Sequence, residues 1–406
     1  MTAQTPGIAA QPPSITVVVL AATGAQIAAA MGIAIFPVLA PQLALMLGVD
    51  ASAVGYQISL LFGAAMLAST VVGTVVLRWG ACRGMQWALW LAAAGMLIAM
   101  VGQLWAMPLA ALCIGASNAL AAAAAAHLLF RFAPPRHRNL IFSIKQTGVP
   151  LGWALIALVA PVMTLRWGLR VSLVVIMAYA AVAALLFERW RPFWDDDRDP
   201  RAAGRTRLFT GVVELWRYPV LRYLGLAAFF FSFLQLCVGT FTVNLLVKDA
   251  GYSLVAAGLM LSLVQAAGMA GRLGFGWIAD RSGRAIAALT VTSLCAAAGC
   301  IISIFISAEW PPVLLALFYL LFGVVAYGWN GVLHAQIARL SPPGLVSVVT
   351  GGVMIWIFAG ILIGPSLFAV TYRAIGSYTT TFGFLAAAGL VSAWLAARAV
   401  GAEPRA

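Results

Sequence analysis

The chain has 406 residues, of which 63% are hydrophobic and only 9% carry a charge, and its mean hydropathy is +1.01. This composition excludes a water-soluble globular protein, in which about a quarter of the residues are charged. The formal net charge of +13 does not indicate nucleic-acid binding, because the basic residues are spread over many short segments between apolar runs rather than gathered on one face.

Apolar runs long enough to cross a membrane recur from residue 14 to the C-terminus. A spanning helix needs about 20 such residues, so the pattern predicts twelve membrane-spanning helices. The first run is preceded by no basic residue and by no cleavage pattern, so it is expected to be retained rather than removed as a signal peptide. The predicted spans are 14–37, 53–76, 85–105, 107–130, 140–163, 168–189, 221–247, 254–279, 284–307, 311–337, 345–371 and 377–399.

Charge, proline and glycine concentrate between the sixth and seventh spans, where no further span is possible. We therefore expect an N-terminal six-helix bundle over residues 1–190, a cytoplasmic linker over 191–220 and a C-terminal six-helix bundle over 221–406. The halves repeat each other, because shifting the sequence by half its length aligns several residues of the first half with identical residues of the second. The aligned residues are Gly73, Arg78, Gly80, Thr147 and Gly148 with Gly276, Arg281, Gly283, Thr350 and Gly351. The predicted fold is an all-α membrane protein of two pseudo-symmetric bundles.

The distribution of lysine and arginine predicts the orientation in the membrane, because cytoplasmic loops retain an excess of these residues. If both termini are cytoplasmic, most of the 24 basic residues fall on the cytoplasmic side. Only Arg166, Arg170, Lys248 and Arg373 then fall outside, with Lys145 and Arg272 inside predicted spans. Both termini are therefore expected in the cytoplasm.

The loop after the second span of each half resembles the signature of the major facilitator superfamily, G-x-x-x-D-R-x-G-R. The second half carries it intact, as Gly276-Trp-Ile-Ala-Asp280-Arg281-Ser-Gly283-Arg284. The first half has a degraded copy from Gly73 to Gly80, with Leu77 at the position of the acid. The resemblance covers essentially the whole chain and implies a secondary transporter that works by alternating access, commonly as a monomer.

This signature predicts a gate at the cytoplasmic side. Its glycines allow close helix approach, and its acid can pair with an arginine or face a helix N-terminus. The alternative is that the loop only shapes the turn and fixes the topology. The candidate gating residues are Gly276, Asp280, Arg281, Gly283, Arg284 and Arg78.

Two further stretches resemble a bacterial subgroup of this superfamily whose substrate is not assigned. They are Ser143 to Gly152 in the fifth span and Gly328-Trp329-Asn330-Gly331 in the tenth. The resemblance implies that the protein is a multi-pass protein of the bacterial inner membrane.

Lys145 and Arg272 are the basic residues predicted to lie well inside spans. Ionisable side chains cost at least about 2.5–3.5 kcal/mol there, so they are candidates for a transport pathway. Lys145 could instead extend toward the headgroups, and Arg272 could serve only a structural contact with carbonyls or with Asp280. In the superfamily the fifth and eighth helices meet where the halves face each other, so the resemblance places one cation on each half. Arg272 also resembles a carboxylate-binding arginine of monocarboxylate and oxalate carriers.

All eleven acidic residues map to loops, the linker or helix ends, which disfavours organic cations and favours an anionic or polar neutral substrate. His334 and His127 are candidate proton carriers, although a structural role is the commoner one for such histidines. Uncharged polar side chains in the spans are candidates for lining the substrate site, although each could equally form an interhelical hydrogen bond. They are Gln26, Asn118, Gln146, Gln235, Gln265, Tyr327, Trp329 and Asn330.

The sequence carries no phosphate-binding loop, no G-x-S-x-G nucleophile motif and no metal-ligand spacing, so neither an enzyme nor an ATP-driven pump is predicted, and no cofactor or metal is expected. A channel, or a receptor derived from a transporter, stays an alternative. The favoured prediction is transport of a small organic anion, with protons as a candidate coupling ion and membrane lipid as the surroundings. The runner-up is efflux of hydrophobic or neutral compounds.

Overall fold

A computed structural model of the protein describes residues 14–134, 138–201, 210–282, 284–342 and 346–402. Helices account for nearly all of the secondary structure in these ranges, and no strand occurs in them. The first bundle contains α1 Ile15–Val38, α2 Ala40–Leu47, α3 Val54–Trp79, α4 Ala81–Ala99, α5 Ala106–Phe132, α6 Arg138–Gln146, α7 Gly148–Trp167 and α8 Leu169–Phe187. The second contains α11 Pro219–Asn244, α12 Leu254–Ser282, α13 Ala285–Ile302, α14 Pro312–Tyr327, α15 Trp329–Leu340, α16 Val346–Ile375 and α17 Tyr378–Ala402. The short α9 Arg191–Trp194 and α10 Thr210–Arg217 lie between the bundles in sequence.

The all-α membrane fold predicted from the sequence is confirmed. Eleven segments of the described chain are long and apolar enough to cross a membrane. The remaining predicted span is α4, a helix of 19 residues that is less apolar because Arg83 and Gln86 lie in its first two turns. Two predicted spans each consist of two helices, because the helix is interrupted at Thr147 between α6 and α7 and at Gly328 between α14 and α15.

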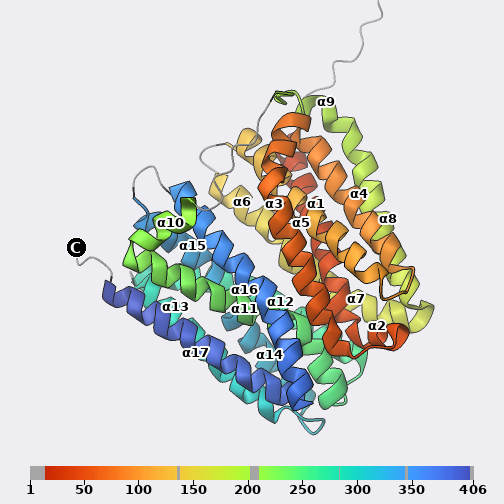
Figure 1. Cartoon of the computed structure of the whole chain (residues 1–406), viewed down its shortest axis with the longest axis vertical. Helices are drawn as coiled ribbons and strands as arrows, with labels where there is room; N and C mark the ends of the chain where they lie inside the picture. Colours follow the sequence, from red (N-terminus) through yellow and green to blue (C-terminus); the bar gives the residue numbers. More distant parts are fainter. Residues whose placement is uncertain (1–13, 135–137, 202–209, 283, 343–345, 403–406) are drawn as a thin grey trace, which may run out of the picture.

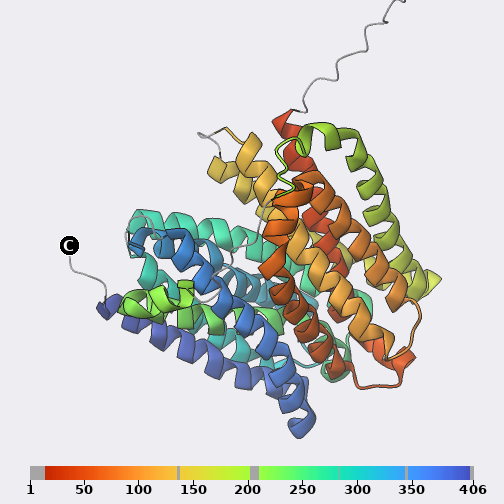
Figure 2. The same cartoon turned by 45° about the horizontal axis from the view of Figure 1, so that its top comes forward.

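The two bundles lie side by side and converge toward one end of the molecule (Figures 1 and 2). We call the end that carries Asp50 and Lys248 the distal end. The opposite end, which carries Ser14 and Ala402, is called the terminal end. Successive long helices run in opposite directions between these two ends.

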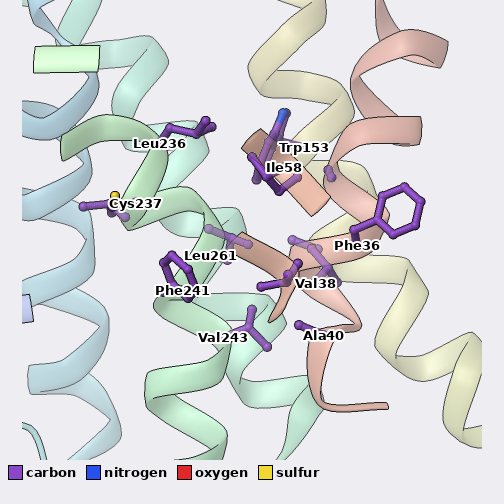
Figure 3. Close-up of a cluster of buried hydrophobic side chains, with 14 of the residues drawn as sticks. Phe36, Val38, Ala40, Ile58, Trp153, Leu236, Cys237, Phe241, Val243 and Leu261 are labelled. Carbon is purple, nitrogen blue, oxygen red and sulfur yellow. The ribbon is translucent and has the colours of Figure 1, made fainter. Parts of the chain in front are cut away.

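The largest hydrophobic cluster joins the two bundles (Figure 3). It includes side chains of the first bundle, such as Ile58 of α3 and Trp153 of α7, together with Leu236 and Phe241 of α11 and Leu261 of α12. Because lipid tails are themselves apolar, these side chains stabilise the contact between the bundles mainly by close van der Waals packing. The halves are therefore held together by a continuous core on the distal side.

Polar contacts reinforce this junction at the distal end. Asn244 Nδ2 donates to the carbonyl oxygen of Ala51 at 3.1 Å, and Lys248 Nζ lies 3.2 Å from Asp50 Oδ2. Both bonds link the second bundle to the loop before α3. Because the Asp50 and Lys248 side chains are about 40% and 36% exposed, this ion pair contributes little energy and acts mainly as a geometric contact.

Glycines allow the helices of the two halves to touch backbone to backbone. A Cβ placed on Gly258 of α12 would collide with the carbonyl oxygen of Ala157 on α7 and lie 2.8 Å from Pro161 Cγ. At the terminal end the situation differs, since a Cβ on Gly73 or on Gly276 would meet no atom within 4 Å. The two repeated glycines of the signature loops therefore face open space in this conformation.

The region predicted as the linker is attached to both bundles. Asp195 is 5% exposed, and its carboxylate accepts hydrogen bonds from the backbone N–H groups of Cys82 and Arg83, at 2.7 and 3.1 Å, which caps the N-terminus of α4. Farther along, α10 packs on the second bundle, where Trp216 stacks on Trp356 with ring centroids 5.7 Å apart. The exact domain boundaries stay a prediction.

Candidate functional site

Lys145 lies in the last turn of α6 and is 5% exposed. Its Nζ is 3.5 Å from Oε1 of the neighbouring Gln146, a long hydrogen bond to a neutral group. Among the described side chains, no carboxylate lies within ion-pairing distance of this ammonium. Lys145 is thus a buried cation whose charge is not compensated by the described part of the protein.

Arg272 lies in α12 and is only partly accessible. Its Nε donates to the backbone carbonyl oxygen of Tyr327 at 3.3 Å, and its two terminal nitrogens have no hydrogen-bond acceptor among the described residues. None of the carboxylates that the structure describes pairs with it. The side chain of Asp280, which the sequence offered as a structural contact for Arg272, lies outside the described residues.

The antiparallel register of α7 and α12 allows the levels of the two cations to be compared by counting residues. Ser262 Oγ of α12 donates to the carbonyl oxygen of Ala154 on α7 at 2.9 Å, and one turn closer to the distal end Gly258 approaches Ala157. Ten residues from Ser262 toward the terminal end is Arg272, and ten residues from Ala154 in the same direction is Ile144, next to Lys145. This count agrees with the expectation of similar levels for Lys145 and Arg272, which stays a prediction because the helix is interrupted at Thr147.

The interruption between α14 and α15 gathers polar side chains from three helices. Gly328 stands at this point because a Cβ there would collide with the carbonyl oxygen of Val324 and the ring of Phe275. The residues on either side are tied to other helices. Gln265 Nε2 of α12 donates to the Tyr327 hydroxyl at 3.1 Å, while Gln235 Oε1 of α11 accepts from Trp329 Nε1 at 2.8 Å and from Asn330 Nδ2 at 3.0 Å.

Gln26 and Asn118 are the remaining predicted polar residues. Gln26 is 3% exposed on α1, and its Oε1 has no hydrogen-bond partner among the described residues. A Cβ on Gly148, at the start of α7, would lie 3.3 Å from Gln26 Cβ, so Gln26 packs beside the helix interruption that follows Lys145. Asn118 lies on α5 and is half-buried.

The two histidines occupy different places. His334, in α15, lies within electrostatic range of Arg272 and is half-buried. His127, in α5, lies 2.8 Å from Asp197 Oδ2 at the terminal end, where Arg131 also pairs with Asp197 at 3.1 Å. The structure therefore brings His334, but not His127, to the arginine.

The predicted gating residues lie on the terminal end. Arg78 and Arg281 are exposed, and their guanidinium groups lie over the rings of Trp79 and Trp277, with the arginine carbon 6.0 and 5.6 Å from the ring centroids. Arg284 is also exposed. Gly283 lies outside the described residues, as does the side chain of Asp280. None of the described contacts of this loop joins the two halves in this conformation.

Sequence reasoning did not identify Trp153 or Ser262 as residues near the site. Trp153 is 6% exposed, and its ring lies 3.3 Å from the position of a Cβ on Gly239 of α11. Both residues are ordinary members of apolar spans in the sequence, so no pattern distinguishes them. Among the described residues, no group of three or more His, Cys, Asp or Glu side chains could hold a metal ion.

The arrangement is rich in hydrogen-bond donors and positive charge. Lys145 and Arg272 supply two cations, one from each half, and no carboxylate among the described residues pairs with either of them. Such a pair is costly in hydrocarbon unless it is solvated or neutralised by a ligand. An anion with one or two acidic groups fits this site chemically.

Comparisons with known proteins point to one family. The Major Facilitator Superfamily model matches residues 22–365. MFS transporter asaE of Aspergillus flavus is 25% identical over 60% of this chain and 54% of its own length. An uncharacterized MFS-type transporter of Mycobacterium tuberculosis is 29% identical over 41% of this chain and 36% of its own length. The matches thus span from about a third to about half of these relatives.

Solved transporters share the fold. The peptide transporter POT in complex with sulfate aligns with a TM-score of 0.74 and 15% identity over 96% of this chain and 95% of its own. A bacterial homolog of the human lysosomal transporter Spinster, in an inward-facing and unoccupied conformation, aligns with a TM-score of 0.72 and 16% identity over 97% and 96% of the two chains. The nucleoside transporter NupG aligns with a TM-score of 0.74 and 14% identity over 94% and 99%.

Proposed function

Since the chain belongs to the major facilitator superfamily, a family of transporters and not of enzymes, we propose that it moves a small organic anion across the membrane by alternating access. The observation that carries this proposal is the pair formed by Lys145 and Arg272. They belong to helices of different halves, residue counting from the α7–α12 contact gives them similar depths, and no described carboxylate pairs with either of them. The polar side chains around the α14–α15 interruption complete the site.

The position of the cations gives the anion a mechanical role. The α7–α12 contact is tight at Gly258 and Ser262, and both cations lie beyond it toward the terminal end. An anion held by Lys145 of one half and Arg272 of the other would draw the two halves together there. A ligand shifts a conformational equilibrium only by its difference in affinity for the two states, and a bridging anion has such a difference.

The orientation follows from the distribution of basic residues. With both termini in the cytoplasm, the terminal end faces the cytoplasm and the described state is sealed on the outside by the distal core. The fold resembles that of a Spinster homolog in an inward-facing conformation, which supports a state that is open at the terminal end and closed at the distal end. We further propose a location in the bacterial inner membrane and function as a monomer, as is common in the superfamily.

Proton coupling would use His334. A protonated His334 would add a positive charge near Arg272, with which it interacts electrostatically. A bound anion would offset that added charge. Anion and proton would then favour each other's binding by the same factor, as linkage requires. The proposed cycle is symport of an anion with a proton, in which His334 carries the proton. His127 takes no part in it, because it is held by Asp197 at the terminal end.

The proposal is tested with ligands matched in shape and different in charge. Thermal stability of the purified protein is measured with benzoate, benzamide and benzylamine, and then with lactate and oxalate. We expect carboxylates alone to stabilise the protein, and Arg272→Gln and Lys145→Gln to abolish the effect. Lys248→Gln is the control, since it removes the chain's other lysine, which pairs with Asp50 far from the site. Flux of the stabilising carboxylate into proteoliposomes then completes the test.

Two outcomes would contradict the proposal. If benzamide and benzylamine stabilise the protein and carboxylates do not, the two cations are structural and efflux of neutral or hydrophobic compounds becomes the better function. If carboxylates stabilise the wild type and both site variants equally, the anion binds elsewhere. For coupling, His334→Gln should abolish the dependence of carboxylate uptake on an imposed pH gradient while carboxylate binding is retained.

A further inference from the structure

Gln235 stands out on α11 by its exposure. The side chains from Phe231 to Leu246 are buried except that of Gln235, which is partly accessible. The one partly accessible side chain of this closed stretch is thus a polar one, and a few accessible polar groups among apolar side chains are typical of a ligand site. The position lies one turn from Gly239, against which Trp153 of the other half packs.

The orientation of the Gln235 amide is fixed by its neighbours. Oε1 accepts from Trp329 Nε1 at 2.8 Å and from Asn330 Nδ2 at 3.0 Å. An indole N–H can only donate, so the oxygen and not the nitrogen of the amide must face α15. The indole is itself held in place, because Trp329 is 1% exposed and stacks on Phe231 with ring centroids 5.0 Å apart.

The nitrogen of the same amide therefore points away from α15 with both hydrogens available. Among the described residues, Gln235 Nε2 has no hydrogen-bond acceptor, and neither have the terminal nitrogens of Arg272. Both groups flank the segment from Tyr327 to Asn330, since Arg272 binds the carbonyl oxygen of Tyr327 and Gln235 binds Trp329 and Asn330. Arg272 and Gln235 thus each present free N–H donors on this side of the site.

We propose that Gln235 is a specificity-determining residue that donates its amide N–H groups to a carboxylate group of the substrate. The inference rests on the proposed function, because it assumes that an anion binds at Arg272. It adds that the anion is recognised by neutral donors on α11 as well as by charge. A carboxylate meets this requirement through oxygens that each accept more than one hydrogen bond.

The informative variant is Gln235→Glu. A glutamate keeps the oxygen that accepts from Trp329 and Asn330, so the fold and the helix interruption are retained, whereas the free donor becomes a negatively charged acceptor. We expect the affinity for benzoate, or for whichever carboxylate of the panel stabilises the wild type, to fall at least about tenfold to a hundredfold, as loss of a hydrogen bond to a charged group implies. Affinity for benzylamine should rise in the same variant, which a purely structural role would not produce.

Trp329→Phe separates positioning from contact. It removes one of the two donors that orient the amide and leaves the amide nitrogen in place, so its effect on carboxylate affinity should be smaller than that of Gln235→Glu. The inference is overturned if Arg272→Gln abolishes carboxylate binding while Gln235→Glu leaves both the carboxylate affinity and the response to benzylamine unchanged. If instead Arg272→Gln has no effect, the proposed function itself fails.

Discussion

Replacement of Gly258 by alanine tests whether backbone contact between the halves stabilises the described conformation. The added Cβ would collide with the carbonyl oxygen of Ala157 and lie 2.8 Å from Pro161 Cγ. Neither atom belongs to a flexible side chain, so α7 and α12 must separate. Overpacking of this kind typically costs about 1–3 kcal/mol, which corresponds to roughly a 5- to 150-fold change in an equilibrium constant. Because the contact joins the two halves, the cost falls on the state in which the distal end is closed.

Gly276→Ala is the matched control. Gly276 lies in the same helix, and a Cβ there would meet no atom within 4 Å in this conformation. Both substitutions gain the same helix propensity of about 0.5–1 kcal/mol, which cancels in the comparison. If the signature loop packs against the other half when the terminal end closes, Gly276→Ala should disfavour that state and shift the equilibrium in the opposite direction.

The assay is a distance measurement between spin labels on the two halves at the terminal end. Arg189→Cys and Arg398→Cys are suitable positions because both residues are exposed, and the exposed Cys295 would be replaced by serine. We expect Gly258→Ala to move population from the longer distances of the described state to shorter ones. An unchanged distribution in Gly258→Ala, or the same shift in both glycine variants, would refute the argument that cross-half backbone contact controls the equilibrium.

Two predictions concern the docking of the linker on the first bundle. Asp195→Ala removes the acceptor of two backbone N–H groups at the start of α4 and should destabilise the protein by about 1–2 kcal/mol in thermal unfolding. Asp199→Ala is the control and should have little effect. Equal melting temperatures of the two variants would contradict the prediction. The hydrogen bond from Arg131 lowers the pKa of Asp196 in the folded protein below its usual value. The contact therefore stabilises the folded protein fully at pH values above the pKa that Asp196 has in the unfolded chain. This stabilisation is lost as the pH falls through the lower pKa that Asp196 has in the folded protein. A spin label at Arg198→Cys should accordingly keep its mobility between about pH 5 and 8 and become more mobile below about pH 4. A change of mobility confined to the neutral range would contradict the prediction.

Hydropathy was sufficient to predict the fold, because each span must satisfy its own backbone in the membrane and so appears as a separate apolar run. The helix interruptions at Thr147 and Gly328 could not be predicted from these runs. At Gly328 a side chain has no room, because a Cβ would collide with the ring of Phe275 on α12 and with the carbonyl oxygen of Val324, one turn earlier in α14. The amphipathic α10 was also missed, because it was read as part of a charged linker.

At the site, the cost of burying charge was the informative signal. It singled out Lys145 and Arg272 before any contact was known, and the α7–α12 contact then supplied the register from which their similar depths are counted. The orientation of the Gln235 amide could not be foreseen, because it depends on Trp329 and Asn330 approaching from another helix. Sequence identifies polar residues in a span, but only the contacts of the folded chain determine which of their atoms remain free.

The two helix interruptions bear on mechanism because of their places in the two halves. Lys145 precedes one of them, and Arg272 holds the carbonyl oxygen of Tyr327 beside the other. Backbone that leaves regular helix at membrane depth is tolerated where it lines a cavity or is buried in protein, and in transporters such segments commonly surround the substrate. An anion between the two cations would thus lie beside the interruption at Thr147, between α6 and α7, and the interruption at Gly328, between α14 and α15. Bending at these two points would leave the long helices α12 and α16 intact. Substrate binding would then be coupled to local bending on the terminal side, while the core at the distal end acts as the hinge.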